Sequence, residues 1–141
     1  MDTKKYFLAA LAYIVCTFLI AAPWHLVVFK PLYDELAIFT RQEPLISLAL
    51  LSMLMQGLVL SYLYPLFARG THSIKTGAAF GLLMGALFAS SAVFAESGKQ
   101  NVTSLPTWLA VESVCYLIQS TIVGAVMGMI YAKVEPTHGL R

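Results

Sequence analysis

The amino-acid sequence predicts an all-α protein, a polytopic membrane protein whose four helices form an antiparallel transmembrane bundle. Charged residues make up 11% of the 141 residues and hydrophobic residues 59%, whereas a soluble domain carries about 25% charged residues. Four apolar runs are each long enough to cross the hydrocarbon core of a bilayer, which takes about 20 residues of helix. We therefore expect a single transmembrane domain over residues 1–141, with lipid as its main solvent.

The four runs cover residues 6–29, 45–67, 76–95 and 108–131. The first three contain no Asp, Glu, Lys or Arg, and the fourth contains only Glu112. Strands of a membrane barrel alternate apolar and polar residues, but these runs are uniformly apolar. Because backbone polar groups in lipid have to be satisfied within the protein, each run is predicted to be a helix. Short loops between the runs predict antiparallel neighbours.

Basic residues differ in number between the two sides of the predicted bundle. The side with both chain ends and the middle loop carries six: Lys4, Lys5, Arg69, Lys75, Lys133 and Arg141. The opposite side carries three: Lys30, Arg41 and Lys99. Since Lys and Arg are in excess on the cytoplasmic side of membrane proteins, both termini are predicted to be cytoplasmic.

The first outer loop is bracketed by prolines and shows a helical pattern. Its apolar residues Leu32, Leu36 and Phe39 recur at helical spacing, whereas its charged residues fall between them. This pattern predicts a short amphipathic helix over residues 31–43 on the outer membrane surface.

Glycines recur at every fourth position in the last two runs. The third run contains Gly77, Gly81 and Gly85, and the fourth contains Gly124 and Gly128. Small residues at this spacing let the backbone of another helix approach closely. The stripe predicts either packing of the third helix on the fourth within one chain or the interface of a homodimer.

Polar residues at membrane depth are costly and are therefore candidates for a functional site. His25 and Glu112 each lie four residues inside the outer end of a run, which is roughly 6 Å at 1.5 Å per residue. If the first and fourth helices are neighbours, the two side chains can form a hydrogen-bonded pair that lowers their desolvation cost. The residues predicted to surround this pair are Trp24, Tyr33, Glu96 and Trp108.

Three interpretations of this cluster remain open: a structural pair at the membrane interface, a ligand- or proton-binding crevice, and a metal site. The metal site is disfavoured because no two potential ligands share the spacing of helix-borne metal sites. We therefore predict no metal and no cofactor.

A second polar group is predicted deeper in the bundle. Glu112, Tyr116 and Gln119 share one face of the fourth helix. Gln56 lies near the middle of the second helix, one turn from Ser52. A hydrogen bond between Gln56 and Gln119 is predicted, either as a link between helices or as part of a polar pathway.

Other classes of site lack support. The net charge of +2 is small and dispersed, so nucleic acid is not an expected partner. Cys16 and Cys115 are predicted about 20 Å and about 10 Å below the outer ends of their helices, too different in depth for a disulfide. His72 and His138 fall in a loop and in the tail, where solvated side chains are expected.

Two segments resemble a family of small four-span bacterial inner-membrane proteins that is defined only as a domain of unknown function. They are Ala22-Pro23-Trp24-His25 leading to Phe29-Lys30-Pro31-Leu32-Tyr33, and the glycine-rich stretch from Gly77 to Gly85. Some such families carry Tyr-Asp after the third span, where this chain has Phe94-Ala95-Glu96. The resemblance implies a four-span fold in the bacterial cytoplasmic membrane, and it implies no activity.

The sequence thus favours a non-enzymatic membrane protein. It is expected to be an accessory subunit of a larger complex, or a small-molecule binding or transport protein with a polar crevice at the outer face. The alternative is a membrane-embedded enzyme that uses His25 and Glu112 as an acid–base pair. Expected partners are the lipid bilayer and a second copy or a larger membrane complex.

Overall fold

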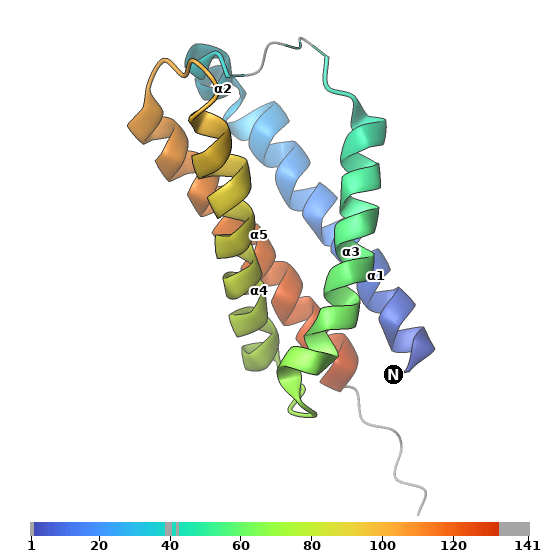
Figure 1. Ribbon diagram of the computed structural model, residues 1–141. Coiled ribbons are helices and arrows are strands. Elements are labelled where there is room, and N and C mark those ends of the chain that lie inside the picture. Colours follow the sequence, from blue (N-terminus) through green and yellow to red (C-terminus); the bar gives the residue numbers. More distant parts are fainter. Residues whose placement is uncertain (1, 39–40, 42, 133–141) are drawn as a thin grey trace, which may run out of the picture.

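The computed structural model describes residues 2–38, 41 and 43–132, and every regular element in this part of the chain is a helix (Figure 1). The elements are α1 (Thr3–Pro23), η1 (Trp24–Val28), α2 (Lys30–Leu36), α3 (Ile46–Ala68), α4 (Ile74–Ala89), η2 (Ser90–Ala95) and α5 (Leu105–Ala132).

Four helices are long and apolar enough to cross a membrane: Thr3–Val28, Ile46–Ala68, Ile74–Ala95 and Leu105–Ala132. The predicted all-α bundle is confirmed, and every predicted boundary lies within one helical turn of the observed one. We call the end of the bundle that carries α2 the α2 end, and the opposite end, which carries the chain start, the N-terminal end.

Helices α4 and α5 form the closest contact in the bundle. A Cβ atom added to Gly77 would lie 2.1 Å from the carbonyl oxygen of Gly124, and one added to Gly81 would lie 2.0 Å from that of Ser120. A Cβ on Gly128 would lie 2.2 Å from the oxygen of Ser73. The two glycine series thus lie against each other's helices within one chain, and a contact between two copies has to use another surface.

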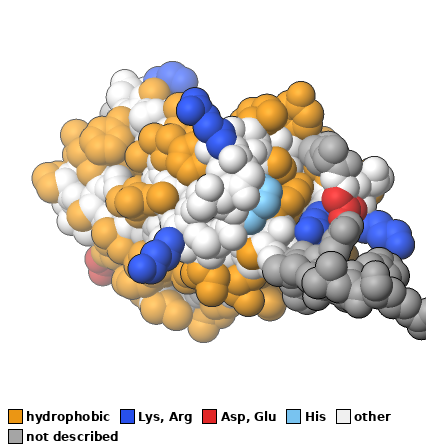
Figure 2. Space-filling view, turned by 90° about the horizontal axis from the view of Figure 1, so that it is seen from below, with side chains coloured by type: hydrophobic (Ala, Val, Ile, Leu, Met, Phe, Trp, Pro, Cys, Tyr) orange, Lys and Arg blue, Asp and Glu red, His pale blue; other side chains and the backbone are white. Residues whose placement is uncertain are grey.

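The larger of two core clusters in the bundle lies toward the N-terminal end. Its buried residues come from all four long helices: Ala9, Tyr13, Leu60, Tyr64, Ala68, Phe80, Val123, Met127, Ile130 and Tyr131. Figure 2 views the molecule from this end, with hydrophobic side chains on its flanks and Lys and Arg side chains dispersed around them.

Helix α3 leaves the bundle as it approaches the α2 end. Residues 46–52 of α3 are exposed, whereas Gly57, Leu60, Ser61 and Tyr64 farther along the helix are buried. Figure 1 shows the same divergence between α3 and the α4–α5 pair. The bundle is therefore closed at the N-terminal end and open beside the first turns of α3.

The predicted outer helix over residues 31–43 is wrong in length, because the structure forms α2 only over Lys30–Leu36. Helix α2 ends at Leu36, because Ala37 adopts a left-handed conformation with φ of 55°. Tyr33 and Leu36 are buried against Val93 and Trp108. Its apolar residues therefore pack against the end of the bundle. Phe39, which was part of the predicted helix, lies outside the described residues.

Two π-helical segments, η1 and η2, extend α1 and α4 at the α2 end. Pro23 precedes η1 and has no N–H to donate to the preceding turn. The backbone N–H of Phe29 donates to the carbonyl of Trp24 at 3.0 Å, five residues back. Single π-helical turns inside α-helices occur often at functional sites, and η1 contains His25.

Candidate functional site

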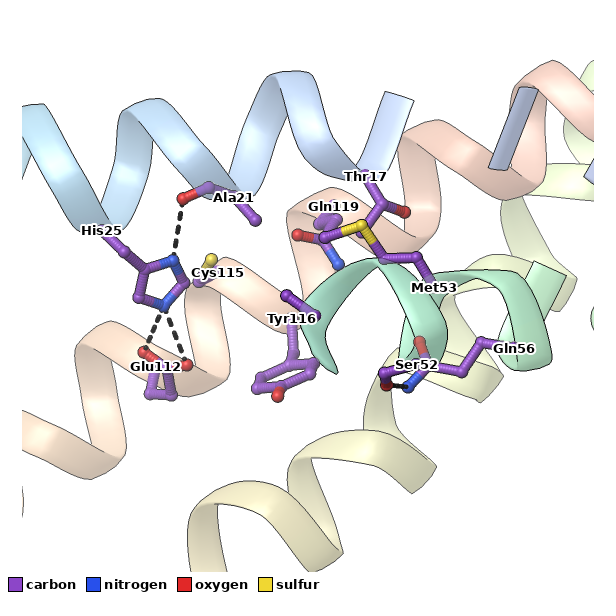
Figure 3. A pocket seen from close by; sticks show the side chains of 11 residues that line it. Thr17, Ala21, His25, Ser52, Met53, Gln56, Glu112, Cys115, Tyr116 and Gln119 are labelled. Carbon is purple, nitrogen blue, oxygen red and sulfur yellow. Dashed lines mark hydrogen bonds and ion pairs between the residues drawn. The ribbon is translucent and has the colours of Figure 1, made fainter. Parts of the chain in front are cut away.

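A crevice of about 160 Å³ lies between α1, α3 and α5, where α3 diverges (Figure 3). Three small or flexible apolar residues, Ala21, Ala49 and Met53, form part of its wall. The remaining lining residues are Thr17, His25, Ser52, Gln56, Glu112, Cys115, Tyr116 and Gln119. Most of the lining residues therefore carry a polar atom, although the accessible wall of the crevice is mostly apolar.

His25 and Glu112 form the predicted pair across the crevice. Nε2 of His25 lies 3.2 Å from Oε1 and 3.3 Å from Oε2 of Glu112. Nδ1 of His25 lies 2.9 Å from the carbonyl oxygen of Ala21. Because a carbonyl only accepts hydrogen bonds, Nδ1 has to carry a proton and donate it.

The fixed role of Nδ1 determines the protonation of the pair. A neutral imidazole that donates from Nδ1 has a lone pair on Nε2, which would repel an ionised Glu112. One proton therefore lies between Nε2 and the carboxyl group, as imidazolium with carboxylate or as imidazole with carboxylic acid. In both forms the net charge of the pair is zero.

Tyr33 of α2 and Trp24, the neighbour of His25 in η1, extend this pair. The Tyr33 hydroxyl donates to Oε2 of Glu112 and accepts from Nε1 of Trp24 at 3.1 Å. The Tyr33 ring lies edge-on to Trp108 with centroids 6.0 Å apart. The sequence prediction grouped these four residues with His25, and the structure brings them together. The network joins α1, α2 and α5 at the α2 end.

The environment of Tyr33 predicts a loss of stability at alkaline pH. Burial, followed by the hydrogen bond to Glu112, raises the pKa of the Tyr33 hydroxyl above its ordinary value of 10.0. At pH above about 10 the unfolded chain releases this proton while the folded protein keeps it, so the free energy of unfolding falls as pH rises.

We expect Tyr33→Phe to reduce the difference in unfolding temperature between about pH 8 and about pH 11, because this variant lacks the titrating hydroxyl. Thermal unfolding of the wild-type and Tyr33→Phe proteins in the same detergent, at both pH values, measures this difference. Equal differences in the two proteins would show that Tyr33 makes no contribution at alkaline pH.

Glu96 does not join the network. Its carboxylate accepts hydrogen bonds from Nε2 of Gln100 at 2.9 Å and from Nζ of Lys99 at 3.3 Å. These bonds lower the pKa of Glu96. The prediction that Glu96 belongs to the site is not supported by its position, because the residues that follow η2 turn back and bond it locally.

Gln56 and Gln119 both line the crevice but do not bond to each other. Oε1 of Gln56 accepts from the Tyr13 hydroxyl at 2.5 Å, and its Nε2 donates to Oγ of Ser52 at 3.1 Å. The predicted bond is absent because α3 packs on α1 at this level and not on α5. A Cβ atom added to Gly57, next to Gln56, would lie 3.0 Å from the backbone oxygen of Ala10, so α3 lies close to α1 here.

The Gln119 amide is a polar group of the crevice wall that makes no hydrogen bond within the described part of the chain. Its side chain faces the crevice, and the residue is 8% exposed. Among the described residues, no hydrogen bond reaches its amide, and Figure 3 likewise shows none. Because the amide faces the crevice and makes no bond within the chain, it is available to bond a molecule bound there.

Some residues that line the crevice were not part of the sequence prediction. Thr17 and Ala21 of α1 and His25 of η1 recur at every fourth position and line the crevice, and Tyr13, one turn earlier, bonds Gln56. This spacing was visible in the sequence.

His72, expected to be solvated, stacks between Tyr64 and Tyr131 with ring centroids 5.6 Å and 5.5 Å away.

The function has to be argued from this geometry. Comparisons of the chain with protein-family models, with curated proteins and with solved structures give no match.

Proposed function

We propose that the protein binds a small molecule in the crevice between α1, α3 and α5, and that it acts as a binding or transport protein or as an accessory subunit. The buried amide of Gln119, which faces the crevice without a partner, carries the proposal. An unpaired buried amide costs about 1–3 kcal/mol by protein mutational data. A bound molecule that hydrogen-bonds this amide offsets that cost.

We place the crevice at the outer face of the bacterial cytoplasmic membrane, with both termini in the cytoplasm. Lys4, Lys5, Arg69 and Lys75 lie at the N-terminal end, and Lys30, Arg41 and Lys99 lie at the α2 end. This excess at the N-terminal end supports a cytoplasmic location for that end. The α2 end, where the His25–Glu112 pair lies, then faces outward.

Two glutamine variants separate a binding role from a structural one. Gln119→Leu removes an unpaired amide and is expected to raise the free energy of unfolding of the ligand-free protein by about 1 kcal/mol. Gln56→Leu removes an amide bonded to Tyr13 and Ser52, and is expected to lower it by about 0.6–1.7 kcal/mol. Unfolding titrations in sodium dodecyl sulfate measure both.

The comparison is matched because both variants exchange the same residue types in the same crevice. A loss of stability in Gln119→Leu equal to that in Gln56→Leu would show that Gln119 is a link between helices. The proposal would then lose its main support.

Binding is tested directly by identifying the compounds that remain with the protein after it is purified from native membranes. Mass spectrometry of the released molecules is expected to find a compound with the wild-type protein and to find it depleted in Gln119→Leu. Equal amounts of every released compound in both samples would contradict a site at Gln119.

An enzyme remains the second candidate because Nε2 of His25, which shares a proton with Glu112, borders the crevice. Such a pair can act as acid and base toward a bound molecule. An enzyme would convert the retained compound during incubation, whereas a binding protein returns it unchanged. Conversion that is lost in His25→Ala would favour the enzyme.

A further inference from the structure

We infer that the ligand of the crevice is an uncharged amphiphile, with a ring-sized polar head beside Gln119 and a hydrocarbon tail that leaves the bundle beside α3. This inference rests on the proposed function and names the chemical class of the molecule bound there. Three properties of the crevice lead to it: its volume, its charge and its sideways opening.

The volume limits the head of the ligand. The crevice measures about 160 Å³, and an enclosed cavity of about 150 Å³ in another protein holds one benzene molecule. A head of similar size fits the crevice. The head therefore has the size of a single ring or of a glycerol ester.

The charge of the crevice favours a neutral head. His25 and Glu112 share one proton and cancel in charge, and the other polar lining residues are hydroxyls, amides or a thiol. A charged head would bring an uncompensated charge out of water, at a cost of several kcal/mol. A neutral head avoids this cost and meets Gln119 with an acceptor for the amide N–H and a donor for the amide oxygen.

The sideways opening accounts for the tail. Residues 46–52 of α3 are exposed, so the crevice is flanked by the exposed first turns of this helix. Its exposed side chains include Ile46, Leu48, Leu50 and Leu51. In a bilayer these side chains lie among lipid chains, so a tail beside them stays in hydrocarbon while the head occupies the polar crevice.

The test uses Cys115, a free and buried thiol that lines the crevice. Cys16→Ser leaves Cys115 as the sole thiol, since the chain has two cysteines. The protein is reconstituted in lipid nanodiscs, and the rate of Cys115 alkylation by N-ethylmaleimide is measured. Three probes share one chain length and differ in head charge: monodecanoylglycerol (neutral), decanoate (anionic) and decylamine (cationic).

Monodecanoylglycerol is expected to slow alkylation of Cys115 by about tenfold when most sites are occupied, and the two charged probes are expected to have little effect. When Gln119→Leu is added, about ten times more monodecanoylglycerol should be needed for the same protection, as expected for the loss of one good hydrogen bond. The matched control, Cys115→Ser, reports alkylation of Cys16. No probe should change that rate, which excludes a general effect on the bilayer.

Equal or stronger protection by a charged probe would overturn the inference and leave a binding crevice of another chemistry. Failure of all three probes to protect Cys115 would also overturn it. The proposed function itself is judged separately, by the stability of Gln119→Leu against that of Gln56→Leu.

Discussion

Gly81→Leu is expected to prevent stable folding of the bundle. A Cβ at this position would lie 2.0 Å from the carbonyl oxygen and 2.8 Å from the carbonyl carbon of Ser120. Both atoms belong to the backbone of α5, so no side-chain rotation relieves the clash and α4 has to move away. Overpacking in a core typically costs about 1–3 kcal/mol, and we expect a loss above this range because α4 and α5 separate.

Gly98→Ala is the control for this prediction, because the nearest atom to its added Cβ is 3.5 Å away, an ordinary contact. Size-exclusion chromatography and detergent unfolding are expected to show normal folding for Gly98→Ala and a strong loss of folded monomer for Gly81→Leu. Normal stability of Gly81→Leu would mean that α4 and α5 are not packed backbone to backbone.

Glu112→Leu is expected to lower the free energy of unfolding by about 3–5 kcal/mol, the range seen when one partner of a buried ion pair is removed. The change leaves Nε2 of His25 and the Tyr33 hydroxyl without the carboxyl group that both contact. A large part of the cost comes from these remaining polar groups, and a second substitution should recover it.

The double variant His25→Leu/Glu112→Leu is therefore expected to be more stable than Glu112→Leu alone, because apolar residues often replace a whole buried pair at little cost. A double-mutant cycle by detergent unfolding measures the coupling. Glu96→Gln, at an exposed carboxylate, serves as the control and is expected to leave stability unchanged. Additive effects of the two leucine substitutions would contradict a direct His25–Glu112 pair.

The four long helices follow from the sequence because each depends on local composition. An uninterrupted apolar run of about 20 residues has only one common structure in lipid. The sequence predicted the approach of His25 to Glu112 from their similar depth, on the condition that the first and fourth helices are neighbours, and the structure meets this condition.

The crevice was not predictable in the same way, because it depends on the angle at which α3 leaves the bundle. Gln56 and Gln119 lie at similar depths, and the sequence therefore predicted a bond between them. Their partners depend on which helices touch: Gln56 bonds Tyr13 of α1, and Gln119 faces the cavity. Similar depth is thus insufficient to predict contact.

The length of α2 and the π-helical segments were missed for local reasons. Helical spacing continued beyond Leu36, but Ala37 adopts a left-handed conformation that ends the helix, and alanine gives no signal of this. Pro23 did signal a change in α1, because it removes a hydrogen-bond donor. The sequence did not show that the helix would continue as η1 with His25 on its inner side.

The most direct test of the account is a crystal structure, grown in a lipid mesophase, of protein purified from native membranes. We predict non-protein electron density within hydrogen-bonding distance of the Gln119 amide, in a crevice that is open beside α3. A structure in which α3 closes on α5 and Gln119 bonds another protein group, with no density between the helices, would contradict a binding site.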